Sequence, residues 1–215
     1  MGKRNDKAVK ITKYFLERQP DASSELMFRN EFELLVATIL AAQCTDKRVN
    51  TVTPELFRHY PTPEAMSKAS VEEIHNLIKS VSYPNSKSKY LSSMSKMLVE
   101  KHGGKVPDSM EELVKLPGVG RKTANVVLAF AFGKEAMPVD THVFRVSHRL
   151  GLVSDRERTP EAVEKVLVKI FPEGHVAQAH HWLLLHGRYV CTSRKPHCKE
   201  CGLATLCDFN AKQAK

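Results

Sequence analysis

The sequence predicts an all-α fold, because helix-start patterns recur along the chain, apolar residues repeat at helical spacing, and strand patterns are missing. Ser70 with Glu73 and Ser109 with Glu112 match the capping box, in which a hydroxyl and an acid cap the first turn. A second pattern, Thr-Pro-Glu, supplies a polar cap, a proline at the first helical position and an acid in the first turn. It occurs at 53–55, 62–64 and 159–161. We therefore expect roughly ten short helices joined by brief polar turns.

Apolar residues follow these helix starts at spacings of three and four, as an amphipathic helix requires. Examples are Phe32, Leu35, Val36, Ile39 and Leu40, then Leu113 and Leu116, then Val163, Val166, Leu167 and Ile170. Alternation of polar and apolar residues, the mark of a half-buried strand, is missing, as are Asn-Gly hairpin turns. The basic stretch from Lys3 to Lys13 is expected to form one face of a first helix.

The charge balance favours a polyanionic partner. The 215 residues include 33 Lys and Arg against 24 Asp and Glu, which gives a net charge of +9 and a pI near 9.3. Cationic side chains release the counterions condensed on phosphates, so this surplus favours nucleic acid. The first ten residues lack the apolar core of a secretory signal, and the apolar run 126–132 is too short to cross a bilayer. We expect a cytoplasmic protein, associated with the nucleoid if bacterial, that has no membrane partner.

Residues 112–133, ELVKLPGVGRKTANVVLAFAFG, predict a helix, a glycine-containing turn and a second helix that Gly133 ends. The proline ends the first helix, and the two glycines permit positive φ and a close approach by another backbone. The second helix then presents free N–H groups together with Arg121 and Lys122, which is a phosphate-binding arrangement. A plain glycine-capped turn between helices is the alternative. The string LPGVGRKTA is similar to the helix–hairpin–helix element of DNA-binding proteins, which holds the backbone without reading sequence. The expected DNA contacts are Leu116, Pro117, Gly118, Val119, Gly120 and Arg121.

Lys122 and Asp140 are the predicted catalytic pair. Asp140 stands where the N-cap of the next helix belongs, so capping is its alternative role. A helix from Lys122 to Phe132 would run roughly 16 Å from the hairpin, and the residues from Gly133 to Asp140 could retrace about 23–25 Å. Asp140 can therefore return beside Lys122. A neutral lysine amine can attack the sugar carbon that bears a base and form a Schiff base, which permits strand scission by β-elimination.

The carboxylate would stabilise the oxocarbenium charge that develops on the sugar when the glycosidic bond breaks. It would also orient or deprotonate the amine. The positive end of the helix and the neighbouring Arg121 both favour the neutral form of an amine at this place. A solvated surface lysine, or one that only contacts phosphate, is the alternative for Lys122.

Four of the five cysteines lie within the last 25 residues, with the spacing C-x6-C-x2-C-x5-C. They are Cys191, Cys198, Cys201 and Cys207. Four thiolates can hold zinc or an iron–sulfur cube; zinc sites usually pair two short knuckles, and only one is present here. The spacing favours a [4Fe–4S] cluster with a structural role, with zinc as the alternative. Arg194 and Lys195, between the first two cysteines, are expected to lie on the DNA backbone. Cys44 is expected to be a small buried residue inside a helix.

With these elements in this order, the chain resembles the endonuclease III family, bifunctional DNA glycosylases of the helix–hairpin–helix superfamily. The resemblance covers essentially the whole chain and rests on LPGVGRKTANVVL, the VDTH segment and the cysteine spacing. It implies a six-helix barrel domain at 24–134 and an iron–sulfur domain formed by 1–23 and 135–215, with DNA bound in the cleft between them. Lys122 would be the Schiff-base nucleophile and Asp140 the essential acid.

The same resemblance implies a monomeric enzyme that removes oxidised pyrimidines, such as thymine glycol, from double-stranded DNA. The damaged base must leave the stack before its sugar can be attacked. Gln43 would fill the gap left behind, and a loop at 81–87 would wedge against the opposite strand through Tyr83. The family commonly has an aliphatic residue where Tyr83 stands, and Pro84 also departs from its pattern. Asp46 would line the pocket, or else cap a helix.

Three other functions fit parts of the pattern. An adenine-specific mismatch glycosylase shares the cluster and the hairpin but lacks the nucleophilic lysine and carries a further C-terminal domain, which this sequence is expected to lack. A thymine-mismatch glycosylase has tyrosine where Lys122 stands. A non-enzymatic module could grip DNA through the hairpin alone, but pure binding needs no carboxylate beside a cationic site.

Overall fold

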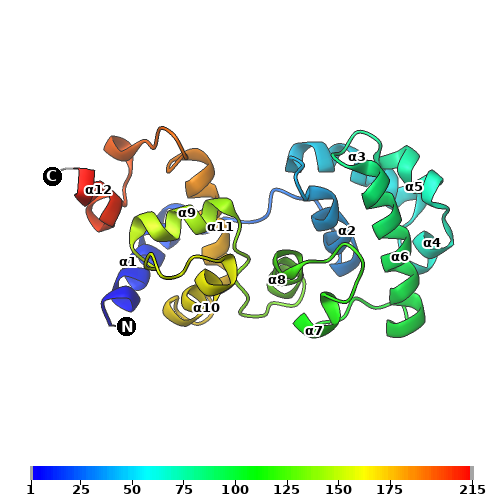
Figure 1. Cartoon of the computed structure of the whole chain (residues 1–215), viewed down its shortest axis with the longest axis horizontal. Helices are drawn as coiled ribbons and strands as arrows, with labels where there is room; N and C mark the ends of the chain where they lie inside the picture. The colour runs from blue at the N-terminus through cyan, green and yellow to red at the C-terminus, as the bar shows by residue number, and fades with distance from the viewer. Residues whose placement is uncertain (1, 214–215) are drawn as a thin grey trace. The chain divides into compact units, whose positions relative to one another are not determined.

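The computed structural model describes residues 2–213, and over this range it contains helices and no strand (Figure 1). The predicted all-α class is confirmed. The chain divides into two compact units. One is Ser24–Gly133, and the other combines Met1–Ser23 with Lys134–Lys215. Among the described residues, none of the helices is both long enough and apolar enough to cross a membrane.

In the unit formed by residues 24–133, the long helix α6 packs against α4 and α5, as Figure 1 shows. Its helices are α2 (Glu31–Ala41), α3 (Asp46–His59), α4 (Pro63–Lys68), α5 (Val71–Ile78), α6 (Pro84–His102), α7 (Met110–Leu113) and α8 (Arg121–Phe130). Helix α2 is the central element, because it packs on α3, α6 and α8 and is buried along nearly its whole length. This burial agrees with a segment in which every residue from Phe32 to Ala41 is apolar except Glu33 and Thr38.

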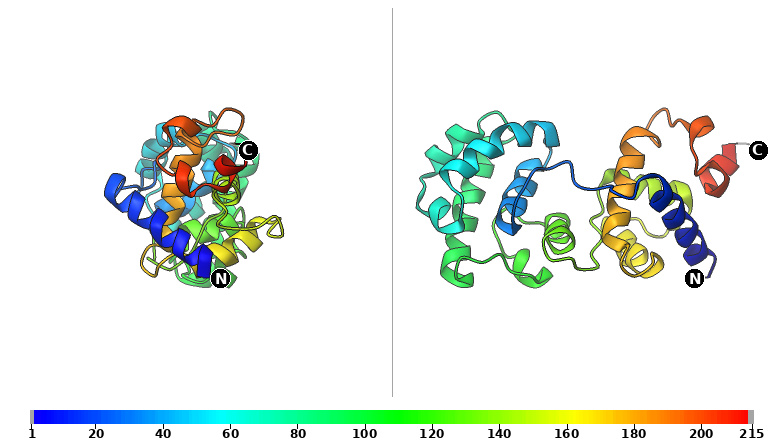
Figure 2. Two further views of the ribbon diagram at one scale, coloured as in Figure 1. Left: turned by 90° about the vertical axis from the view of Figure 1, so that its left-hand side faces the viewer. Right: turned by 180° about the vertical axis from the view of Figure 1, so that it is seen from behind.

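The other unit joins both ends of the chain. It contains α1 (Gly2–Arg18), α9 (Thr141–Leu150), α10 (Pro160–Ile170), α11 (Val176–Tyr189), the 3-10 turns η1 (Cys198–Glu200) and η2 (Ala204–Leu206), and α12 (Asp208–Gln213). Phe15 of α1 stacks on Trp182 of α11 with ring centroids 5.6 Å apart, and the Trp182 indole donates to the Gln19 carbonyl at 2.9 Å. This packing of the first helix against the C-terminal half can be followed from behind in Figure 2.

Most of the predicted helix starts are confirmed. Ser70 forms a complete capping box with Glu73, and Ser109 accepts the amide of Glu112. Thr62 and Thr159 cap α4 and α10, each with a proline at the first turn.

The predicted helix start at 53–55 is wrong, because these residues lie inside α3. Thr45 caps α3, and the helix continues through Pro54 to His59. Val49, Val52 and Leu56, on both sides of the proline, are all buried. Packing of this apolar face therefore outweighs the loss of one backbone hydrogen bond at the proline.

The buried His181 of α11 is expected to make the folded protein less stable in acid. Burial lowers the pKa of His181 to about 4 from an ordinary 6.5, so between these values the unfolded chain binds more protons than the folded one. Stability should therefore fall as pH falls through this window, with His181 contributing about 2 kcal/mol of the loss by pH 5. Urea unfolding of the wild type and of His181→Phe at pH 7.5 and pH 5 measures the difference. Equal losses in both proteins would contradict this assignment.

Candidate active site and cysteine cluster

The predicted hairpin begins with a type II turn at Leu116–Val119. The Val119 amide donates to the Leu116 carbonyl at 3.1 Å, and Gly118 has φ +82°. Proline at the second position and glycine at the third are the residues that this turn favours. Leu116 and Val119 are 2% and 7% exposed, so their side chains anchor the turn while Gly118 remains at the surface.

The two hairpin glycines have different roles. A β-carbon on Gly118 would lie 2.9 Å from the Tyr90 β-carbon, so this position excludes a side chain through both φ and packing. Gly120 has φ −94° and open space around it, so the expectation of positive φ is wrong there. Gly120 is the N-cap residue of α8, and because it has no side chain, it makes no side-chain hydrogen bond to the first amides of the helix. Both glycines leave the backbone accessible from outside.

Lys122 lies in the first turn of α8 and is exposed. Arg121 precedes it, and no acid stands in that turn. The N-terminus of a helix carries a partial positive charge and amides that point outward, so this turn is suited to an anion. The helix is anchored from its fourth residue, because Ala124 to Ala129 are all buried.

Asp140 is the N-cap residue of α9. Its Oδ1 accepts the amide of Val143 at 2.8 Å, and the side chain is half-buried. The buried residues Met137 and Val139 anchor the segment that leads to it. The capping role offered by the sequence is therefore present. Lys122 belongs to the unit 24–133 and Asp140 to the other unit, so each is positioned by a helix N-terminus of its own.

Gln43 follows α2 in a second type II turn. The Cys44 amide donates to the Ala41 carbonyl at 3.1 Å, Ala42 has φ −58° and ψ 114°, and Gln43 has φ +53°. Gln43 is exposed, whereas Cys44 is half-buried in the turn, so the expectation that Cys44 is buried inside a helix is wrong. Asp46 lies in the first turn of α3, but the cap is Thr45.

Tyr83 is the N-cap residue of α6. It has φ +56° and ψ 50°, makes no side-chain cap and is 63% exposed. Pro84 is then the first residue of the helix, a position that proline suits because the amide there has no helical partner. The departure from the family pattern at Pro84 is therefore compatible with the local backbone.

Sequence reasoning missed Lys87, which is 4% exposed and buried between α6 and the end of α2. Its ammonium donates to the carbonyls of Leu40 and Ala42, both at 2.7 Å. Burial lowers the pKa of this lysine, and the Cys44 thiol opposes that shift. Only its place one turn after Tyr83 could have drawn attention to it, since a lysine in a polar helix start is ordinarily solvated.

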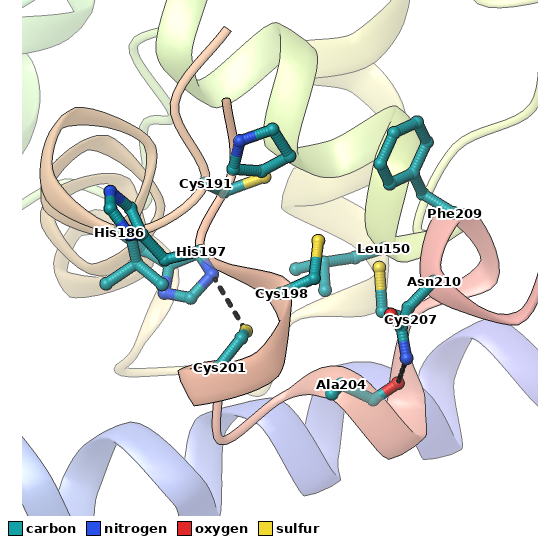
Figure 3. A pocket seen from close by; sticks show the side chains of 12 residues that line it. Leu150, His186, Cys191, His197, Cys198, Cys201, Ala204, Cys207, Phe209 and Asn210 are labelled. Atoms are coloured by element: carbon teal, nitrogen blue, oxygen red, sulfur yellow. Dashed lines mark hydrogen bonds between the residues drawn. The ribbon is translucent and has the colours of Figure 1, made fainter. Parts of the chain in front are cut away.

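The four clustered cysteines line one pocket (Figure 3). Leu150, Pro196 and Phe209 add apolar surface to its lining. Burial raises the pKa of the Cys201 thiol, and the nearby sulfurs of Cys207, Cys191 and Cys198 raise it further. Metal centres bind thiolates, so a positively charged centre here would offset the cost of ionising Cys201.

Within the described residues, no three His, Cys, Asp or Glu side chains converge on one point as the ligands of a single metal ion would. Tetrahedral zinc brings its sulfurs within about 4 Å of one another, since each Zn–S bond is about 2.3 Å. In an iron–sulfur cube each thiolate binds a different iron, so the sulfurs stand farther apart. The number and spacing of the four cysteines along the chain are compatible with either kind of centre.

Two residues that sequence reasoning missed hydrogen-bond to the thiols. Arg149 donates to Cys191 Sγ at 3.4 Å, and its backbone carbonyl accepts from Cys207 Sγ at 3.2 Å. His186 Nε2 lies 3.6 Å from Cys201 Sγ, as Figure 3 shows. Burial lowers the pKa of His186 to about 4, so at neutral pH its ring is uncharged and carries one N–H.

Arg194 and Lys195 are exposed on the loop between Cys191 and Cys198, as expected for a backbone contact. Arg149 also fixes this loop, because its guanidinium donates to the carbonyls of Thr192 and Ser193 at 2.8 Å each. The loop therefore takes its shape from α9 as well as from the cysteines at its ends.

Comparison with known proteins agrees with this combination of elements. Residues 36–173 match the family model of the HhH-GPD superfamily of base-excision DNA repair proteins. The chain is 46% identical over 200 residues to endonuclease III of Rickettsia conorii, covering 93% of this chain and 94% of the relative. It is 42% identical to endonuclease III of Escherichia coli K12 over 206 residues, covering 96% and 97%.

A solved structure of a trapped covalent intermediate of endonuclease III with DNA, an estranged-adenine complex, matches with a TM-score of 0.87 at 43% identity. The match covers 97% of this chain and 95% of the other. A thermostable thymine-DNA glycosylase matches with a TM-score of 0.88 at 26% identity, covering 98% of each chain. The chain belongs to the endonuclease III family of HhH-GPD base-excision repair proteins.

Proposed function

We propose that this protein removes oxidised pyrimidines from double-stranded DNA and then cleaves the strand at the abasic site. The observation that carries the proposal is Lys122, an exposed amine in the first turn of α8 directly after the hairpin. A relative with 43% identity was captured covalently on DNA, as an enzyme that forms a lysine Schiff base would be. The enzyme works as a monomer in the cytoplasm, at the nucleoid in a bacterium.

The Lys122 amine attacks the sugar carbon C1′ of a base that has left the stack. An N–C1′ bond forms, the bond from C1′ to the base breaks, and the base departs with a proton. The sugar ring opens to a Schiff base. Loss of a proton from C2′ then expels the 3′ phosphate by β-elimination, and water releases the amine from the remaining imine. Each step moves protons and electron pairs among lysine, sugar and water, so no external oxidant is needed.

Asp140 supplies the negative charge for this reaction. Positive charge develops on the sugar as the base leaves, and a carboxylate held in place stabilises that charge without reorganisation. The hydrogen bond from Val143 to Oδ1 fixes the carboxylate at the start of α9. We assign the same group to orienting Lys122 or accepting its proton.

The hairpin holds the DNA backbone. Its turn residues Leu116 to Gly120 bring the backbone to the surface, and α8 adds its positive end and Arg121. Such contacts set position and carry no sequence information. Arg194 and Lys195 add a second backbone contact. We assign residues 24–133 as the barrel domain that carries the hairpin and the remainder as the iron–sulfur domain.

Gly118→Ala is expected to weaken DNA binding and stability together. The new side chain would have to adopt φ +82° and would lie 2.9 Å from Tyr90, so the turn must shift. Left-handed strain alone costs about 1–2 kcal/mol. Gly103→Ala is the matched control, because Gly103 has φ +57° and open space around it. Urea unfolding should show a loss in both variants, whereas affinity for undamaged duplex should fall only for Gly118→Ala. Unchanged affinity in both would argue against a binding role for this turn.

The four cysteines bind a [4Fe–4S] cluster that holds the C-terminal segment in shape. Support comes from the donor set and its C-x6-C-x2-C-x5-C spacing, and from the four cysteines lining one pocket. The cluster would supply a rigid, charge-compensating centre, and no step of the reaction passes through it. Purified protein should be brown and contain about four iron and four sulfide ions per chain. A colourless protein with one zinc ion per chain would refute the iron–sulfur assignment.

A thymine-mismatch specificity is the nearest rival, because the thymine-DNA glycosylase has a similar fold. By the family resemblance, the mismatch class has tyrosine where Lys122 stands, so the lysine favours the lyase. Borohydride reduction of wild-type protein on duplexes with thymine glycol, a G·T mismatch or no damage distinguishes them. We expect covalent capture on thymine glycol. Capture on none of the three would refute the lyase proposal, and capture confined to the mismatch would change the substrate.

A further inference from the structure

Two exposed residues hold a backbone conformation that side chains ordinarily avoid. Gln43 has φ +53° and Tyr83 has φ +56°, and among residues 2–213 they are the only residues besides glycine with positive φ. This conformation is unfavourable for a residue with a β-carbon, because the β-carbon crowds the following carbonyl oxygen. They are also the two residues assigned by family resemblance to the gap in the DNA stack and to the opposite strand. Strain that persists at exposed positions needs a structural cause.

Lys87 contacts the backbone at both positions. Its ammonium donates to the carbonyls of Leu40 and Ala42 at 2.7 Å each, directly before Gln43. Its own amide donates to the Tyr83 carbonyl at 3.1 Å, the first hydrogen bond of α6. Lys87 is 4% exposed, so its ammonium is largely shielded from water, although Ala42 itself is exposed. Charged hydrogen bonds of this kind are about twice as strong as neutral ones.

The Ala42 carbonyl is the group whose direction determines the conformation of Gln43. With φ −58° and ψ 114°, Ala42 has nearly the ideal type II values of about −60° and +120°. In a type I turn the peptide between Ala42 and Gln43 is flipped, and the residue at the place of Gln43 has φ of about −90°. The Lys87 ammonium binds the carbonyl in its type II direction. It therefore opposes the flip that would release Gln43 from positive φ.

We propose that Lys87 is a positioning residue that locks Gln43 in the left-handed conformation and ties it to the backbone of Tyr83. This inference rests on the proposed function, in which the two side chains replace and flank the displaced base. A glycine at position 43 would adopt the turn unaided but would have no side chain to insert. A buried cation lets a residue with a side chain occupy the place that the turn reserves for glycine. The two DNA-inserting turns are then one rigid unit, joined through a single lysine.

A purely stabilising role for Lys87 predicts a different result. The Leu40 carbonyl lies near the end of α2, and capping it would stabilise the helix without any effect through Gln43. In that case the losses from changing Lys87 and Gln43 would multiply. If Lys87 acts through Gln43, the loss of the Gln43 side chain removes most of what Lys87 contributes. A double-mutant cycle separates the two.

The experiment measures single-turnover excision of thymine glycol from duplex DNA by wild type, Lys87→Met, Gln43→Ala and the double variant. Lys89→Met is the control, because Lys89 is an exposed lysine two residues further along α6. We expect Lys87→Met to lower the rate about tenfold or more and the double variant to lie within about threefold of Gln43→Ala. Lys89→Met should match wild type.

Multiplicative losses in the double variant, or a Lys87→Met rate within twofold of wild type, would overturn the proposal. If Lys87→Met does not fold, as judged by circular dichroism, the cycle is run with Lys87→Gln, which retains a shorter N–H donor. Failure of both to fold would also overturn it, because the contact would then serve the fold and not the turn. An inactive wild type would instead count against the proposed function.

Discussion

Replacing Lys122 with glutamine is expected to abolish covalent capture by borohydride and to reduce strand cleavage by about three orders of magnitude or more, as loss of a nucleophile does elsewhere. Glutamine retains a polar side chain of similar length, and the exposed position tolerates it without loss of stability. Its amide cannot form a Schiff base. Gel analysis of protein–DNA adducts after reduction measures the capture, and DNA binding by the variant is measured in parallel.

Arg121→Gln is the matched control for charge. Arg121 precedes Lys122 in the same exposed turn, so the variant loses one positive charge and keeps the amine. We expect weaker binding that depends less steeply on salt, with capture retained at saturating protein. Capture of Lys122→Gln at the level of wild type would remove Lys122 from the mechanism. If Arg121→Gln, which keeps Lys122, also lost capture, the loss in Lys122→Gln could be explained by weaker DNA binding and not by the missing nucleophile.

Local rules predicted most helix starts, because capping is a short-range interaction. Ser70, Ser109, Thr62 and Thr159 cap the helices that their sequence contexts indicate. The same rule failed at Pro54, which lies inside α3. The Thr-Pro-Glu pattern there is the same, and the difference is the burial of apolar residues on both sides. Tertiary packing decided that case, and no local pattern records it.

The candidate site shows the same limit. Motif spacing indicated Lys122, Asp140 and the four cysteines, because chemistry requires those residue types at those distances. Lys87 and Arg149 act through backbone carbonyls and sulfurs 40 or more residues away in sequence, as in the contact of Lys87 with Ala42. Their residue types say nothing about burial, and a buried lysine is rare enough that the solvated interpretation is the natural one. Only the fold reveals that their charges are directed inward.

Replacing Asp140 with asparagine should separate catalysis from folding. Asparagine caps a helix about as well as aspartate, because its side-chain oxygen can accept the same amide. The hydrogen bond from Val143 is therefore expected to survive, and urea unfolding should show a change of less than about 0.5 kcal/mol. The negative charge is lost. Excision should fall by about two to three orders of magnitude, the range found when one group that stabilises transition-state charge is removed.

Asp140→Ala supplies the comparison, because it removes the cap together with the charge. Its excision rate should fall as much as that of Asp140→Asn, and its free energy of unfolding should also fall by about 1 kcal/mol. If capping were the whole role of Asp140, the two variants would differ in activity: Asp140→Asn would excise thymine glycol at nearly the wild-type rate, and only Asp140→Ala would be impaired. Single-turnover rates and unfolding curves of the two variants therefore decide whether this carboxylate serves the helix alone or the reaction as well.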